Sequence, residues 1–269
     1  MTLWHWHPSV VLGLVGLLVL YAAAIGRPGR RRGWRPPGAR LGRGRRAAFV
    51  GGTLALGAAL LGPIAEWAEH VALSAHMAQH LLLTLVVPPL WLLGTPDWLL
   101  APLVRLPVVA RAGYVLTRPA TALGLAGAAL VIWHFPVFFE AALAREWIHI
   151  LEHLTLLATG ILAWWPVAGR LAAWPRPAPP ARLLYLFLAT IPMMAVASPI
   201  TMAEEVLYPF YARAGAAWPL SPRADQELAG VLMWIGGSLG YLVAGTIVFF
   251  RWALEEDTER GAVSLAGEP

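Results

Sequence analysis

Two pairs of histidines, His76 with His80 and His149 with His153, lie within or at the start of apolar stretches. On an α-helix, residues four apart lie on one face about one turn apart, so each pair presents two imidazoles in the same direction. Neutral imidazole is a common ligand for copper and zinc. Such side chains are costly to place inside a membrane helix, so their presence there indicates a functional site by default. The two pairs therefore predict a metal or proton-coupled site.

Further side chains are candidates for the same site. As metal ligands we predict His76, His80, His134, His149 and His153, which all fall near the outer ends of predicted membrane spans. We predict four further residues around these ligands. Glu152 and Asp225 would tune the charge of the site or relay the metal, and Met77 and Met233 would offer thioether sulfur nearby. Because thioether sulfur favours Cu(I), the predicted metal is copper, with Cu(I) as its expected state and zinc as the alternative.

Other chemistries compete with copper binding. The stretch His149-Ile-Leu-Glu152-His153 matches the H-x-x-E-H zinc-hydrolase pattern, in which the glutamate is the general base. Two b-type haems would need histidines that face each other across helices, whereas these lie near one surface. A third alternative is a metal-free structural role, in which the histidines form hydrogen bonds between helices.

The composition is that of a polytopic membrane protein. The chain has 269 residues, of which 58% are hydrophobic and 13% charged, with a mean hydropathy of +0.63. The absence of cysteine excludes disulfides and thiolate ligands. Seven apolar runs are long enough to cross the bilayer, and runs of that length cross it as helices. We therefore predict an all-α bundle of seven transmembrane helices. The predicted spans are approximately 9–25, 47–64, 76–93, 120–140, 148–166, 183–203 and 229–250.

The distribution of arginine predicts the orientation. With the N-terminus outside and the C-terminus cytoplasmic, 17 of the 20 basic residues, all arginine, fall in inner connections or the tail. Because they occupy connections between apolar runs, we interpret them as topology determinants and not as a nucleic-acid interface. We predict one transmembrane domain, 1–254, and a disordered cytoplasmic tail, 255–269. The outer connections are rich in acidic residues, a surface that would gather cations.

Prolines interrupt three of the predicted spans, at Pro88-Pro89, Phe135-Pro136 and Ser198-Pro199. Proline has no backbone N–H, so each of these sites leaves a helical carbonyl without its usual donor. We expect local breaks there. Further along, Ser221 followed by Pro222 predicts a helix N-cap with proline at the first helical position.

Ordered motifs from about Gly62 to Trp252 resemble the seven-helix CtaG family of cytochrome c oxidase assembly factors. They are His76-Met77-Ala-Gln-His80 with Pro88-Pro89-Leu90 and Gly94-Thr95-Pro96, Trp133-His134-Phe135-Pro136, His149-Ile-Leu-Glu152-His153, Trp164-Trp165-Pro166, Pro209-x-Tyr211 and Asp225-Gln226-x-x-Ala-Gly-x-x-Met233-Trp234. The resemblance implies a multi-pass protein of the bacterial plasma (inner) membrane that helps mature a haem-copper oxidase at a copper centre. The oxidase subunits would be its partners. It would act as a copper chaperone without turning over a substrate. The five histidines would match the recurring histidines of the family.

Overall fold

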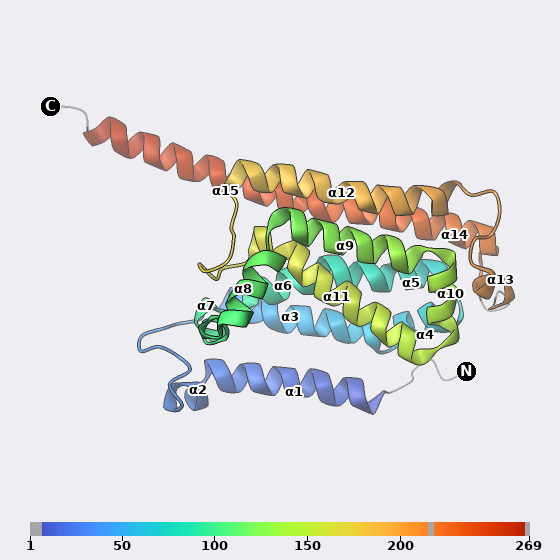
Figure 1. Cartoon of the computed structure of the whole chain (residues 1–269), viewed down its shortest axis with the longest axis horizontal. Helices are drawn as coiled ribbons and strands as arrows, with labels where there is room; N and C mark the ends of the chain where they lie inside the picture. The colour runs from blue at the N-terminus through green and yellow to red at the C-terminus, as the bar shows by residue number, and fades with distance from the viewer. Residues whose placement is uncertain (1–6, 215–217, 267–269) are drawn as a thin grey trace.

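The fold is all-helical, as predicted. The computed structural model describes residues 7–214 and 218–266, and these contain no strand. Five helices are long and apolar enough to cross a membrane, and up to seven spans result if each of two bent helix pairs counts as one. The exact number of spans and the orientation of the termini stay predictions. The helices pack side by side along one common direction (Figure 1).

The first two predicted spans correspond to a straight and a bent element. Helix α1 covers Pro8–Ile25, and the short α2, Arg27–Arg31, follows it. Helix α3, Arg43–Leu60, turns by 40° into α4, Pro63–His70. The bend lies at Gly62, whose φ of +81° is a backbone conformation that residues with a side chain rarely adopt.

The third span carries the first histidine pair, and where the prolines predict a break it stays helical but widens into a π-helical segment. It runs as α5, Leu73–Leu81, then the π-helical η1, Leu82–Val86, then α6, Val87–Gly94. Pro88 cannot donate to the carbonyl of Thr84, and this oxygen accepts instead from the indole Nε1 of Trp164 at 2.9 Å. The neighbouring span thus supplies the missing donor.

The predicted span 120–140 ends earlier than expected. Helix α8, Pro107–Leu116, turns by 74° into α9, Pro119–His134, and a separate helix α10 covers Pro136–Ala144. Phe135 has an extended backbone with φ −70° and ψ 129°, the conformation that a following proline imposes. The break expected at Phe135-Pro136 is confirmed, because Pro136 divides the run directly after His134.

The second half of the chain contains the longest helices. Helix α11 covers Glu146–Ala168 and α12 covers Pro179–Met202. The break expected at Ser198-Pro199 is absent, because α12 continues through Pro199 to Met202. The last apolar run is α14, Pro222–Val231, the π-helical η3, Leu232–Gly236, and α15, Gly237–Ala266. Ser221 caps α14 as predicted, since its hydroxyl accepts from the amide of Ala224. Helix α15 continues into the segment for which composition predicts disorder, while the domain boundary at 254 stays a prediction.

Short elements gather at the two ends of the bundle. Helices α2, α7 (Asp97–Leu100) and α8, with the 3-10 turn η2 (Leu103–Arg105), lie at one end. Helices α4, α10 and α13 (Pro209–Ala214) lie at the other, together with the start of α14 (Figure 1). The last turns of α15 project beyond the rest of the bundle. The main hydrophobic cluster fills the space between the two ends, with side chains from α5, α6, α11, α12, α14 and α15 among others.

Candidate metal centre

The two histidine pairs meet in the interior of the bundle. His76 and His80 come from α5 and His149 and His153 from α11, near the end where α4, α10 and α13 gather. The ring centroids of His76 and His149 are 5.5 Å apart, and those of His80 and His153 are 5.6 Å apart. The sequence could predict each pair but not this meeting, which depends on how α5 and α11 pack.

The side chain of Glu152 lies among the four imidazoles. Its side chain is fully buried, with Oε2 at 3.9 Å from Nε2 of His76 and Oε1 at 3.6 Å from Nε2 of His80. One ligand atom from each of His76, His149, Glu152 and His153 lies within 4.8 Å of all the others. A tetrahedral ion with bonds of about 2.0 to 2.1 Å separates its ligands by roughly 3.4 Å, so atoms at the 4.8 Å limit would have to approach each other by about 1.4 Å to share one ion.

Polar atoms at the centre lack partners within the described residues. Both carboxylate oxygens of Glu152, Nε2 of His149 and Nε2 of His153 are buried without a hydrogen bond. A buried polar atom without a partner costs about 1 to 3 kcal/mol, and proteins pair the great majority of such atoms. Four unpaired atoms, all acceptors or potential ligands, converge on one point. This arrangement suits a cation.

The hydrogen bonds of His134 determine which nitrogen of His80 carries the proton. Nδ1 of His134 lies 2.8 Å from the carbonyl of Leu130 and must therefore be its donor nitrogen. In the neutral ring Nε2 is then an acceptor, and it receives a hydrogen bond from Nδ1 of His80 at 3.3 Å. His80 consequently presents an unprotonated Nε2 to the centre. Both ring nitrogens of His134 are thus engaged in hydrogen bonds. His134 positions His80 as a potential ligand and has no free nitrogen to bind the metal itself.

Tyr211 acts on His76 in the same way. The hydroxyl of Tyr211 donates its single proton to the carbonyl of Ala68, so its oxygen accepts from Nδ1 of His76 at 2.9 Å. Nε2 of neutral His76 is then unprotonated and lies 2.9 Å from the unprotonated Nε2 of His80. Two nitrogen lone pairs at this distance repel each other unless a cation, either a metal ion or an added proton, lies between them.

Asp225 lies at the N-terminus of α5, where its carboxylate accepts hydrogen bonds from the first residues of that helix. Oδ2 accepts from the amide of Leu73 at 2.6 Å and from that of Ser74 at 3.4 Å, and Oδ1 accepts from the Ser74 hydroxyl at 2.5 Å. The first amides of a helix have no partner within it, so Asp225 both satisfies these donors and fixes the helix that carries His76.

The remaining predicted residues differ in their surroundings. Met77 and Met233 are buried side chains of the main hydrophobic cluster, and sulfur ligation by either one stays a prediction. Sequence reasoning missed Tyr211 and Tyr208 as partners of the centre, although Tyr211 belongs to a motif on which the family resemblance rests. The hydroxyl of Tyr208 donates to the carbonyl of His134 at 2.8 Å. A tyrosine in an outer loop near the histidines is the signal that could have identified them.

Comparison with known proteins supports the resemblance. The model of the cytochrome c oxidase caa3 assembly factor family matches residues 19–255. The chain belongs to this family. The match covers every residue of the centre, and the family is defined by assembly of cytochrome c oxidase. Association with an oxidase follows at this general level, and no particular subunit is identified.

Relatives exist among mycobacterial proteins. Uncharacterized proteins of Mycobacterium bovis and Mycobacterium tuberculosis are each 29% identical to the chain over 203 residues, and one of Mycobacterium leprae is 24% identical over 205 residues. Each alignment covers 68% of this chain but only 30% of the relative, so the chain spans about a third of their length. No solved structure matches.

Proposed function

We propose that this assembly factor binds a copper ion between α5 and α11 and delivers it to a haem-copper oxidase in the bacterial plasma membrane. His76, His80, His149 and His153 would be the ligands, with Glu152 balancing the charge of the ion or binding it directly. His134 would act through His80. Copper is cargo in this proposal, and no substrate is turned over.

The observation that carries the proposal is the opposed pair of Nε2 atoms of His76 and His80, 2.9 Å apart and both unprotonated by their hydrogen bonds. The unpaired oxygens of Glu152 offer further ligand atoms beside them. Outer hydrogen bonds that fix the tautomer of a ligating histidine are typical of metal sites. The chain has no cysteine, so nitrogen, oxygen and thioether donors are the ones it can offer.

Delivery would take place from the side of the bundle. The centre lies between helices and His149 and His153 are only partly buried, whereas His76 and Glu152 are completely buried. We propose that copper enters from the end bearing α4, where Glu66 lies, and that an oxidase subunit docked alongside α11 receives it. Ligand exchange at the less buried pair would allow release.

The test is the metal content of protein purified in neutral detergent and loaded with copper. The wild type should retain about one copper per chain, and His76→Ala/His153→Ala should lose nearly all of it, because two of four imidazoles are gone. His70→Ala is the matched control, since His70 is exposed on α4 outside the centre. Equal copper content in the double variant and the wild type would refute the proposal.

Membranes of cells that carry these variants complete the test. Oxidase activity should fall with the double variant and stay normal with His70→Ala. Intact oxidase activity together with lost copper would favour the metal-free scaffold.

A zinc hydrolase is the second candidate, because Glu152 and the pair His149 and His153 do come together with both carboxylate oxygens unpaired. A hydrolase would use Glu152 as general base, so Glu152→Gln should abolish turnover and leave most of the metal in place. The copper proposal predicts instead that Glu152→Gln keeps much of the oxidase activity, because glutamine still offers an oxygen ligand.

A further inference from the structure

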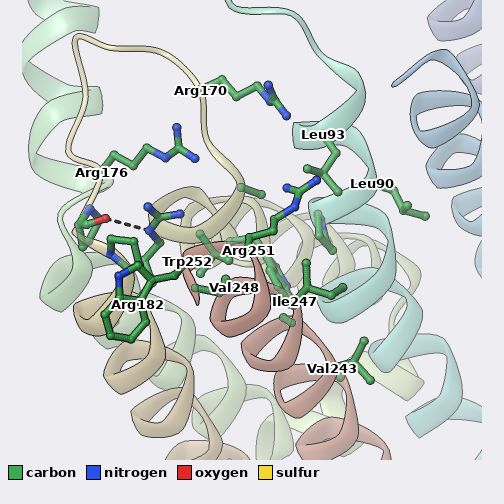
Figure 2. A pocket seen from close by; sticks show the side chains of 18 of the residues that line it. Leu90, Leu93, Arg170, Arg176, Arg182, Val243, Ile247, Val248, Arg251 and Trp252 are labelled. Atoms are coloured by element: carbon green, nitrogen blue, oxygen red, sulfur yellow. Dashed lines mark hydrogen bonds between the residues drawn. The ribbon is translucent and has the colours of Figure 1, made fainter. Parts of the chain in front are cut away.

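A large cavity lies at the opposite end of the bundle from the histidines. It measures about 1060 Å³ and is lined by residues of α6, α11, α12 and α15 and of the segment between α11 and α12. Four arginines, Arg170, Arg176, Arg182 and Arg251, surround it, together with a single acidic residue, Glu255. Figure 2 shows that the guanidinium groups come from the segment between α11 and α12, from α12 and from α15, and gather around one space.

Most of these arginines have no partner among the residues that the structure describes. Within the described residues, the guanidinium groups of Arg170, Arg176 and Arg251 form no hydrogen bond or salt bridge, while Arg182 donates from Nε to the carbonyl of Pro177 at 2.8 Å. Burial and the positive charges of Arg45, Arg176 and Arg251 lower the pKa of Arg170. Repelling charges gathered in this way are typical of sites that bind an anion, and arginine suits phosphate best.

The rest of the cavity is apolar. Leu90 and Leu93 on α6 line this part together with Val243 and Ile247 on α15. Val243 lies farther from the arginines than Ile247 does (Figure 2). Trp252 lies beside the arginines, a position common for tryptophan at the membrane interface. A matching ligand therefore has an anionic head and a hydrocarbon tail, and a small free anion would leave the apolar wall without a partner.

We propose that this cavity binds an anionic phospholipid from the leaflet at the arginine-rich end of the bundle. The phosphate would contact Arg170, Arg176 and Arg251, and an acyl chain would lie in the groove between α6 and α15. Basic pockets between transmembrane helices bind anionic lipid headgroups in this manner. The site is separate from the metal centre, and the proposal does not depend on copper binding.

Native mass spectrometry of the full chain in neutral detergent tests the proposal. Phosphatidylglycerol is titrated against the wild type and against Arg176→Gln/Arg251→Gln. Loss of two arginine contacts should weaken phosphatidylglycerol binding roughly thirtyfold. The matched control is Arg105→Gln/Arg111→Gln, which removes the same charge from exposed residues of η2 and α8 that do not line the cavity. The control should bind phosphatidylglycerol like the wild type.

Two further ligands separate the possible sources of the phosphate. Phosphatidylcholine, whose headgroup carries no net charge, should bind much more weakly than phosphatidylglycerol, and millimolar inorganic phosphate should not displace the lipid. Equal weakening in the control variant, equal binding of the two lipids, or displacement by inorganic phosphate would each overturn the proposal. The single variant Leu90→Asp provides a second check, because a charge on the apolar wall should lower lipid affinity while every arginine stays in place.

Discussion

Replacing Asp225 by alanine should loosen the helix that carries His76 and thereby release the metal. The carboxylate accepts from the Leu73 amide at 2.6 Å and from the hydroxyl and amide of Ser74. Asp225 is 3% exposed, so water cannot easily replace it as an acceptor. The variant would leave the first turn of α5 without its principal partner, two residues before His76.

The expected loss of stability is about 3 to 4 kcal/mol. Hydrogen bonds to a charged group contribute roughly 1.5 to 3 kcal/mol each, and the amide of Leu73 and the hydroxyl of Ser74 form the two short ones. The third contact, at 3.4 Å, is long and adds little. For a chain of this size the loss corresponds to a fall in melting temperature on the order of 10 °C.

The assay pairs thermal unfolding, followed by tryptophan fluorescence, with copper affinity measured well below the melting temperature. Copper affinity should fall about 10- to 100-fold, as it does when an outer-shell partner is removed. Asp225→Asn should be intermediate, since it keeps one acceptor oxygen, and Ser74→Ala should be milder still. Copper lost at unchanged melting temperature would refute the reasoning, because it would make Asp225 a ligand or relay and not a helix cap.

Two further predictions concern the centre itself. His134→Ala should weaken copper binding about 10- to 100-fold without abolishing it, because His80 keeps its ligand nitrogen but loses the partner of its Nδ1, and copper titration of the purified variant measures this. Copper occupancy should fall as the pH is lowered from about 8 to about 5, because protons compete with the metal for imidazole nitrogen; copper content after dialysis at each pH measures this, and an occupancy independent of pH would contradict imidazole ligation.

Local features of the fold followed from the sequence because their causes are local. The spacing of His76 and His80 fixes a common helix face, Pro136 ends α9 at His134, and Ser221 caps α14. The outer end of span four has a local cause as well. Hydropathy continues through Pro136 to about residue 140, but proline disfavours helical backbone at the residue before it, so the helix ends at His134.

Features of the centre that depend on distant segments could not be predicted. Asp225 lies 152 residues from Leu73 in the chain, and from the sequence we predict that it tunes charge or relays the metal, not that it caps α5. The tautomer of His80 depends on His134, which comes from a third helix. Sequence spacing determines the face of a helix, whereas the neighbour of that face depends on packing between helices.

The π-helical segment η1, which follows the histidines of α5, permits a prediction that uses one residue from each of two spans. Trp164→Phe removes the indole donor of the Thr84 carbonyl, which Pro88 cannot replace, so it should cost about 1 to 3 kcal/mol beyond the packing change. In a Pro88→Ala background an amide returns one turn after Thr84, and the same substitution should then cost only the packing term. Unfolding of the four proteins of this double-mutant cycle measures the difference. If Trp164→Phe lowers the free energy of unfolding equally in both backgrounds, the Trp164 indole does not compensate for Pro88. The π-helical segment between α5 and α6 would then have another origin.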